Sequence, residues 1–217
     1  YASVNWNKKT YLLDLEESDD REQAYALLQK ADIVISNYRT KVAEKLGVDY
    51  PTLSQINPAL IFAQLNAFDD YSERPAFDVV LQAEAGFLYM NGEADGPPVK
   101  MPVALIDVLA AHQLKEGILL ALLRRTQTGK GAYVSTSLFE SAVASLVNQA
   151  TNWLMASHIP QRMGTQHPNI APYGDMYTCS DGKAILLAVG TEKQFKNLCQ
   201  VLDLSEILTQ ISFSSIV

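Results

Sequence analysis

The sequence predicts an α/β fold in which crossover helices join the strands of a parallel sheet. Two short apolar segments, residues 33–36 and 60–65, have the composition of buried strands, and residues 10–15 indicate a further strand before them. Segments with helical spacing of apolar residues separate these strands. Strand, helix, strand, helix, strand is the order that parallel sheets require, because each crossover must return the chain to the same edge.

The first helix is predicted to begin near Ser18. The carboxylates of Asp19, Asp20 and Glu22 would interact favourably with the positive end of its dipole. It continues with an apolar stripe made by Ala24, Leu27, Leu28 and Ala31. Residues 51–58 form a turn and a short helix before the next strand. Ligands bind at the carboxyl ends of such strands, so the loops at 37–45 and 66–74 are the expected positions of binding groups.

The second half of the chain is predicted to begin with a helix at 77–85 and a turn-rich loop at 93–98. The longest helix is expected at 107–125 and ends before Gly129. A strand at 133–137 and a second long helix follow, and the helix carries Ala142, Leu146, Ala150 and Leu154 at steps of four. Strands at 176–179 and 184–189 and a helix at 192–202 then predict part of a smaller α+β unit.

The composition excludes several classes of function. With 217 residues, of which 48% are hydrophobic and 19% are charged, the chain is predicted to fold into a globular core. A net charge of −7 argues against nucleic acid as a partner, because such binding needs a basic face. The uncharged segment 141–161 is rich in Ser, Asn and Gln, which favours a buried helix over a membrane span. Two cysteines and no signal-peptide pattern predict a cytoplasmic protein.

The usual motifs of metal, hydrolase and redox sites do not occur. Three histidines are present, but no Gly-x-Ser-x-Gly, His-Glu-x-x-His or Gly-x-Gly-x-x-Gly motif. Residues 128–131 have the composition of a phosphate loop, but they follow a helix and so predict a helix stop. We therefore expect no metal and no redox cofactor.

Asp107 is the residue most suggestive of chemistry. It lies between the apolar run 103–106 and the apolar start of the longest helix. A carboxylate there faces the positive end of the helix dipole, which favours its ionised form. From the residues alone, an N-cap is the more common role, and catalysis is the alternative.

Short motifs follow one another in a specific order along nearly the whole chain. They are Asn7-Lys8-Lys9, Leu13-Asp14-Leu15, 30–34, Asn37-Tyr38-Arg39, 44–48, 57–61, 76–80 with Gln82, Ala83 and Gly86, Gly96-Pro97-Pro98, the segment around Asp107, and 128–131 with Val134. In this order and spacing the chain resembles the class III CoA-transferases, the family of formyl-CoA transferase, carnitine CoA-transferase and methylacyl-CoA racemase.

The resemblance implies a fold and an assembly. Residues 1–157 would belong to a Rossmann-like CoA-binding domain whose N-terminal part lies outside this sequence, because the family is longer at both ends. Residues 158–172 would form a linker or active-site loop, and 173–217 would begin a smaller α+β domain. The expected partner is a second copy of the chain, in an interlinked homodimer.

The resemblance also implies site residues. Asp107 matches the family's nucleophile, and Phe77 matches the base histidine of the racemase branch and a tyrosine of the formyl-CoA branch. The positions that match the coenzyme A site are Leu13, Asn37, Tyr38, Lys45 and Leu46, and Phe77 is also expected to contact CoA. The implied reaction moves CoA from an acyl-CoA to a small carboxylic acid through an aspartyl anhydride and an aspartyl-CoA thioester.

Two alternatives remain open at the level of sequence. An acyl-CoA racemase or epimerase shares the fold, but phenylalanine at position 77 lacks proton chemistry. A non-catalytic CoA-binding protein is the other alternative. It is favoured by Arg39-Thr40-Lys41, which lacks the Pro-Gly that usually follows the family's arginine, and by residues 65–69, which lack the usual glycines.

Overall fold

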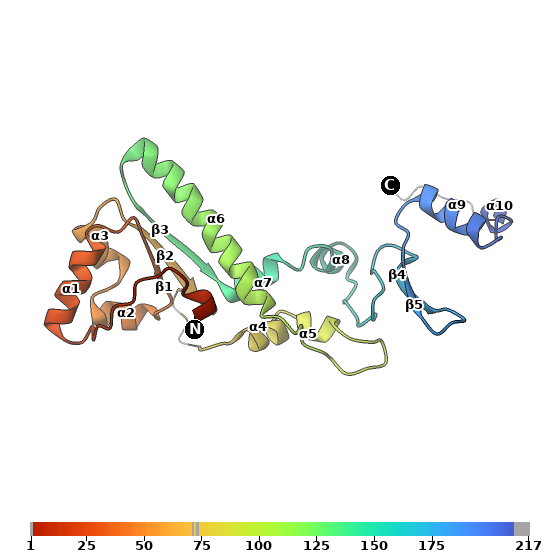
Figure 1. The fold of residues 1–217 in the computed structure, drawn as a ribbon, viewed down its shortest axis with the longest axis horizontal. Coiled ribbons are helices and arrows are strands. Elements are labelled where there is room, and N and C mark those ends of the chain that lie inside the picture. Colours follow the sequence, from red (N-terminus) through yellow and green to blue (C-terminus); the bar gives the residue numbers. More distant parts are fainter. Residues whose placement is uncertain (1, 71, 73, 211–217) are drawn as a thin grey trace. The chain divides into compact units, whose positions relative to one another are not determined.

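The computed structural model describes residues 2–70, 72 and 74–210, and it divides the chain into two compact units (Figure 1). The first unit comprises Tyr1–Ala85 and Pro102–Ser145, and the second comprises Gly86–Met101 and Leu146–Val217. The first unit holds a parallel sheet and the second an antiparallel strand pair. Each unit is described separately below.

The sheet of the first unit contains three strands, β1 (Ile33–Ser36), β2 (Ile61–Asn66) and β3 (Ala132–Ser137). Their order is β1-β2-β3 and both pairings are parallel, with Ile33 beside Ile61 and Ile61 beside Ala132. The predicted α/β fold with a parallel sheet is therefore confirmed. All three strands end at one edge, so the residues that follow Ser36, Asn66 and Ser137 lie near one another.

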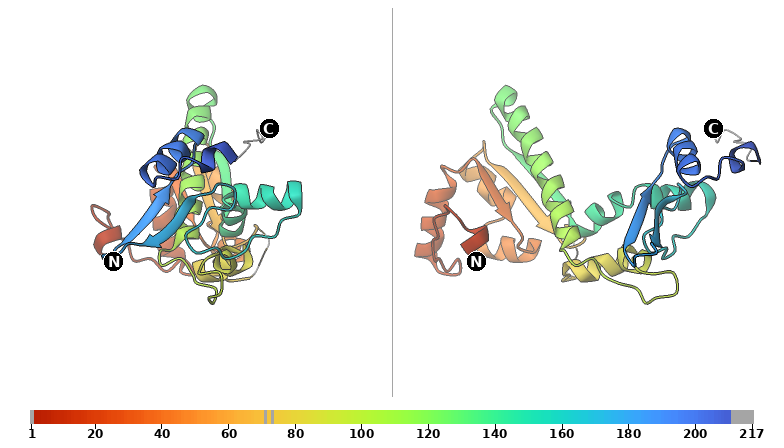
Figure 2. Two further views of the ribbon diagram at one scale, coloured as in Figure 1. Left: turned by 90° about the vertical axis from the view of Figure 1, so that its right-hand side faces the viewer. Right: turned by 45° about the vertical axis from the view of Figure 1, so that its right-hand side comes forward.

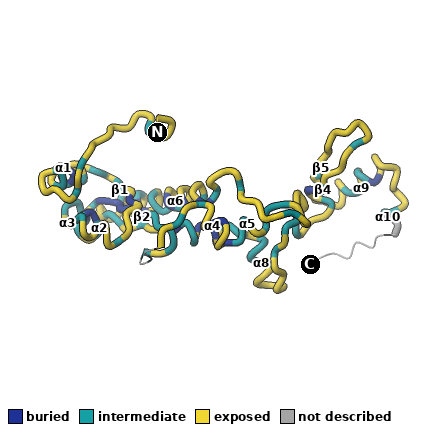
Figure 3. The backbone as a smooth tube through the Cα atoms, turned by 90° about the horizontal axis from the view of Figure 1, so that it is seen from below, coloured by how far each residue is buried: buried dark blue, intermediate teal, exposed yellow. Residues whose placement is uncertain are grey.

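Helices cover both faces of this sheet (Figures 1 and 2). On one face lie α1 (Ser18–Leu28), α2 (Thr40–Leu46) and α3 (Tyr50–Ile56). On the other lies α6 (Leu105–Thr128), which approaches the sheet so closely that a Cβ at Gly117 would lie 2.5 Å from Val134 Cγ1. The central strand β2 is consequently the core, and its Ile61 and Ala63 are completely buried (Figure 3).

Alternate residues of β2 face the two helical layers. Leu60, just before the strand, and Phe62 join a cluster with residues of α2 and α3 and of the loop between them, namely Ala43, Val48 and Leu53. Phe62 also stacks on Tyr133 of β3, with ring centroids 6.0 Å apart. Burial on both faces explains why this segment is continuously apolar, as expected for a central parallel strand.

Helix α6 begins two residues earlier than predicted and extends three residues further. Its C-cap, Gly129, has φ 69° in the left-handed region, and its N–H donates to Arg125 O at 2.8 Å. The segment 128–131 is thus a helix stop, as predicted. None of the helices in the described part of the chain combines the length and apolar character that crossing a bilayer requires.

Two predicted elements were wrong, namely the strand at 10–15 and the single long helix that begins at Leu138. Residues 10–15 form no strand, and Leu12 is 98% exposed. A strand needs the backbone groups of a neighbour, and no described strand pairs with this segment. The helix predicted from Leu138 to Leu154 is divided into α7 (Leu138–Ala144) and α8 (Asn148–Ala156). Val147 between them has φ 43°, which an α-helix does not accommodate.

The second unit contains α5 (Phe87–Met90), α8, β4 (Tyr173–Thr178), β5 (Ala184–Ala188), α9 (Glu192–Val201) and α10 (Ile207–Gln210). The antiparallel strands and α9 confirm the elements predicted there. Residues 86–101 join this unit because Tyr89 and Gly92 bind its later residues, with Arg162 Nη1 donating to Tyr89 O at 3.1 Å. The units therefore differ from the ranges 1–157, 158–172 and 173–217, and these ranges stay predictions as functional domains.

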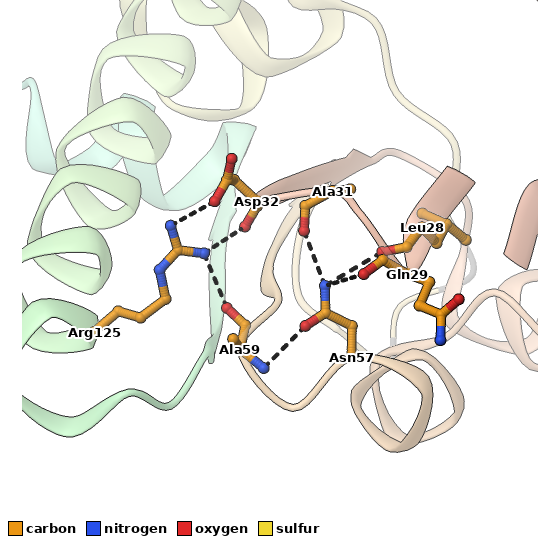
Figure 4. A network of polar contacts seen from close by, with 7 residues as sticks. All are labelled: Leu28, Gln29, Ala31, Asp32, Asn57, Ala59 and Arg125. Carbon is orange, nitrogen blue, oxygen red and sulfur yellow. Dashed lines mark hydrogen bonds and ion pairs between the residues drawn. The ribbon is translucent and has the colours of Figure 1, made fainter. Parts of the chain in front are cut away.

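The motif around Asn57 is structural and lies at the amino ends of β1 and β2 (Figure 4). Asn57 Nδ2 donates to Leu28 O at 3.3 Å and to Ala31 O at 2.9 Å, and Asn57 Oδ1 accepts from Ala59 N–H at 3.1 Å. Beside it, Arg125 of α6 binds Asp32 Oδ1 at 2.8 Å and Ala59 O at 3.0 Å. This network joins α1, β1, β2 and α6 at the edge opposite the carboxyl ends.

We expect Asn57→Ala to lower the free energy of unfolding by about 2 kcal/mol, because it leaves partly buried backbone groups unpaired. Gln55→Ala, an exposed substitution on α3, is the matched control and should change it by less than about 0.5 kcal/mol. Urea unfolding of both variants measures the difference. Equal stability of the two variants would contradict the role given to Asn57.

Candidate active site

A cavity of about 500 Å³ opens at the carboxyl ends of the parallel strands. Asn37 and Arg39 reach it after β1, Asn66 and Ala67 at the end of β2, and Leu138 after β3. The remaining lining residues are Leu65, Ser72, Arg74, Pro75, Ala76, Phe77 and Asp107. The cavity therefore occupies the edge at which a parallel sheet gathers ligands.

Asp107 reaches this cavity because α6 runs back along the sheet. The last turn of α6 binds the amino ends of β1 and β2 through Arg125, so its first turn lies at the opposite edge. The N-cap of α6 is Ala104, and Asp107 is in the first turn with an exposed side chain. The N-cap interpretation of Asp107 was wrong, because the helix begins before it.

The surroundings of Asp107 favour its protonated form relative to an ordinary aspartate. Partial burial raises the pKa of the Asp107 carboxyl, and the negative charge of Asp78 raises it further. The sequence predicted the opposite direction from the helix dipole alone. Desolvation and a neighbouring carboxylate both act in the direction opposite to that dipole. Among the residues that the structure describes, none hydrogen-bonds the Asp107 carboxylate.

Two arginines supply positive charge to the cavity. Arg74 is held by an ion pair to Glu84 of α4 (Asp78–Glu84), and its guanidinium carbon lies 4.1 Å from the centre of the Phe68 ring. Arg39 precedes α2 and is exposed. Guanidinium groups bind carboxylates and phosphates in two-pronged geometry, so this lining suits an anionic acid or a phosphate.

Three residues that the resemblance placed at the CoA site line one neighbouring cavity. This cavity has a volume of about 340 Å³ and includes Leu13, Asn37 and Tyr38 together with apolar residues of α1 and β1. Asn37 lines both cavities, so the two share a wall at the end of β1. The structure thus brings Asn37, Asp107 and Phe77 together, and it places Leu13 and Tyr38 next to them.

Lys45 and Leu46 line neither of these two cavities. Lys45 Nζ lies 2.6 Å from Glu16 Oε1, and this ion pair raises the pKa of Lys45. Leu46 is partly buried against the cluster around Leu53 and Phe62. Their predicted contact with CoA stays a prediction.

Phe77 lies immediately before α4, and its side chain is 79% exposed where it lines the larger cavity. Sequence reasoning did not single out Arg74 and Asn66, although both fall in the loop region expected to bind ligands. That region follows β2, and no spacing rule distinguishes its functional residues from its structural ones.

The predicted active-site loop lies in the second unit. Within it, His167 N–H donates to Tyr173 O at 3.0 Å, and the two rings meet edge to face with centroids 5.6 Å apart. These contacts account for the position of His167 as a structural histidine. A role of residues 158–172 over an active site stays a prediction.

Comparison with known proteins shows which family the chain belongs to. The model of "CoA-transferase family III" matches residues 1–216. The chain belongs to CoA-transferase family III. The resemblance noted from its motifs is therefore confirmed over nearly the full sequence.

The relatives of this family III chain are named as enzymes acting on several acids. It is 33% identical to the acetyl-CoA:oxalate CoA-transferase of Acetobacter aceti, over 98% of the chain and 55% of that protein. It is 32% identical to the succinate–glutarate CoA-transferase of Agrobacterium fabrum, over 95% of the chain and 52% of that protein. The chain spans about half the length of the curated relatives that it matches.

A solved structure supports the fold. The chain superposes on a CAIB/BAIF family protein from Brucella suis with a TM-score of 0.78 and 35% sequence identity, covering 93% of this chain and 54% of that one. At this identity the parallel sheet and its helices are shared features.

Proposed function

We propose that this protein moves coenzyme A from an acyl-CoA donor to a small carboxylic acid, with Asp107 as the nucleophile. The observation that carries the proposal is the position of Asp107. Its carboxylate opens into the cavity at the carboxyl ends of the strands, and it is the only carboxylate among the described residues that line that cavity. The membership in family III supports CoA transfer as the reaction.

In the first half-reaction, an oxygen of the Asp107 carboxylate attacks the thioester carbonyl of the donor. The carbon–sulfur bond breaks, CoA leaves as the thiolate, and a mixed anhydride joins the acyl group to Asp107. The thiolate then attacks the aspartyl carbonyl of the anhydride. This step releases the donor acid as its carboxylate and leaves an aspartyl-CoA thioester.

In the second half-reaction, the acceptor carboxylate attacks the aspartyl-CoA thioester and releases the CoA thiolate again. The thiolate attacks the acceptor's acyl carbon in the new anhydride, which yields the product acyl-CoA and frees Asp107. Charges balance without a proton donor, because each step exchanges one carboxylate or thiolate for another. The energy of the thioester is retained throughout.

The cavity lining supports this chemistry in two ways. Partial desolvation and the negative charge of Asp78 raise the pKa of Asp107, and a more basic carboxylate is a better nucleophile. Leu65 and Leu138 add apolar surface to the cavity in which the anhydride would form. Arg39 and Arg74 offer guanidinium groups to the negatively charged acids.

We propose that coenzyme A extends along the carboxyl end of β1. Leu13 and Tyr38 would contact it in the smaller cavity, and Asn37 would bind it where the two cavities share a wall. Lys45 and Leu46 of α2, and Phe77 beside Asp107, complete the proposed contacts. CoA takes part as a substrate, and the reaction as written uses neither a metal nor a redox cofactor.

We propose an interlinked homodimer in the cytoplasm as the active form.

We propose a dicarboxylic acid as the acceptor. The names of the two relatives include oxalate, succinate and glutarate, which are all dicarboxylates. One carboxylate would react at Asp107 while the second would bind Arg39. Initial rates with succinate, glutarate, oxalate and their monocarboxylate analogues measure this preference.

Trapping of the intermediate tests the central proposal. The full-length protein is incubated with an acyl-CoA, treated with borohydride or hydroxylamine, and digested for peptide mass spectrometry. We expect modification of the peptide that contains Asp107. An active enzyme in which this peptide stays unmodified would refute the assignment.

Phe77 supports transfer over racemisation. Racemisation needs a second group that carries a proton, and a phenyl ring beside Asp107 does not provide one. We expect no exchange of deuterium from solvent into the carbon next to the thioester. Nuclear magnetic resonance of recovered acyl-CoA measures that exchange, and its appearance at the rate of turnover would favour a racemase.

A further inference from the structure

A polar cluster joins α4 to the start of α6, directly beside Asp107. Asp78 Oδ2 accepts the backbone N–H of Ile106 at 2.7 Å. Asp78 Oδ1 accepts from Gln82 Nε2, and the same amide nitrogen lies 3.5 Å from Val103 O. Gln82 and Ile106 are both completely buried. The cluster therefore holds the loop and the first turn that carry Asp107.

The start of α6 has no cap of its own. Its N-cap residue is Ala104, which offers no side-chain acceptor to the free N–H groups of the first turn. A helix needs acceptors for these groups, and the carboxylate of Asp78 supplies one from a different helix, 28 residues earlier in the chain. The position of Asp107, one residue after Ile106, thus depends on a contact with α4.

We propose that Asp78 is a positioning residue for the transfer reaction. Its carboxylate fixes the first turn of α6 so that Asp107 presents its carboxylate to the cavity. The inference rests on the proposed role of Asp107 as nucleophile. It adds a residue that acts through Asp107 and lines no part of the cavity.

The geometry separates two contributions of Asp78, and two variants distinguish them. Asp78→Asn keeps an oxygen that can accept the Ile106 N–H, and the Gln82 amide can turn to present its oxygen to the new NH₂ group. It removes the charge and keeps the acceptor for Ile106 N–H, although the turned Gln82 amide gives up its 3.5 Å contact with Val103 O. Asp78→Ala removes both the acceptor and the charge. Asp49→Asn is the matched control, because Asp49 caps α3 through Thr52 N–H at 3.1 Å.

We expect Asp78→Ala to lower kcat by on the order of 100-fold, because small displacements of a reacting group have effects of this size. The KM for acyl-CoA should change by less than about threefold, because the residue lines no part of the cavity. Asp78→Asn should recover most of kcat at the pH optimum. Asp49→Asn should behave as the wild-type enzyme in both parameters.

The pH profile gives a readout that a purely structural role would not move. Asp78 on α4 is the charged group that acts on Asp107, and Arg39 and Arg74 line the same cavity; α7 and β3 contribute no charged residue to the described lining. Asp107 must be ionised to attack, and Asp78 raises its pKa. Removing that charge lowers the pKa, so the acidic limb of kcat/KM should move to lower pH in Asp78→Asn.

The outcomes separate this inference from the proposed function. If acyl-CoA labels Asp107 in the wild-type enzyme, but both Asp78 variants keep wild-type kcat and an unmoved acidic limb, the positioning role is refuted and the nucleophile stands. If Asp107 is never labelled in active enzyme, the proposed function fails first. Circular dichroism of each variant establishes that the fold is retained, and Asp78→Asn decides the question if Asp78→Ala does not fold.

Discussion

Asp107→Asn should lower the rate of CoA transfer by about 10⁴-fold or more, because removal of a covalent nucleophile eliminates the reaction path and leaves only binding effects. Binding of acyl-CoA should persist, since most of the proposed contacts with CoA lie elsewhere, at Leu13, Asn37 and Tyr38. Steady-state rates and titration calorimetry with a CoA ester measure the two quantities. An equal loss of rate and binding would indicate that Asp107 has a structural role.

The stability of this variant is also predictable. The folded protein raises the pKa of Asp107, so the ionised carboxylate is less favourable in the folded than in the unfolded state at neutral pH. Asp107→Asn removes that unfavourable charge and should be at least as stable as the wild-type protein at pH 7. Lowering the pH toward the unfolded pKa should reduce the difference between them. Glu116→Gln, an exposed substitution on the same helix, is the control and should leave both rate and stability unchanged.

Gly131→Ala should produce a large loss of stability, about 3 kcal/mol or more, because overpacking against rigid backbone has no inexpensive relief. A Cβ at this position would lie 1.9 Å from Leu60 O and 2.7 Å from Ala59 C. Both atoms belong to the chain leading into β2, and Gly131 N–H donates to Pro58 O at 2.9 Å across the same approach. Thermal and urea unfolding measure the loss.

Gly129→Ala provides a matched comparison two residues away. Gly129 has φ 69°, and its Cβ would meet no atom within 4 Å, so only the left-handed backbone conformation resists the change. We expect a loss of about 1 kcal/mol. A larger loss of stability at Gly131 than at Gly129 would indicate that the backbone of Gly131 packs closely against the chain leading into β2. A larger loss at Gly129 would contradict that packing.

The predictability of the fold differed between elements for identifiable reasons. The strands at 33–36 and 61–66 followed from apolar runs, and in the central strand β2 the run reflects burial on both faces. Residues 10–15 are also largely apolar, but they have no partner strand among the described residues, and a strand depends on that partner as much as on its own side chains. The division at Val147 depended on a single backbone angle, which the apolar spacing of residues 138–154 does not reveal.

The candidate site was predictable only in part. The sequence alone determined the parallel α/β pattern, the helix stop at Gly129 and the family motifs that select Asp107. Only the tertiary structure placed Asp107 in a cavity with Arg39 and Arg74, reversed the expected direction of its pKa, and joined Asp78 to the first turn of α6. These features depend on residues distant in the chain, because desolvation, Coulomb interactions and helix capping act through space and leave no periodic pattern in the sequence.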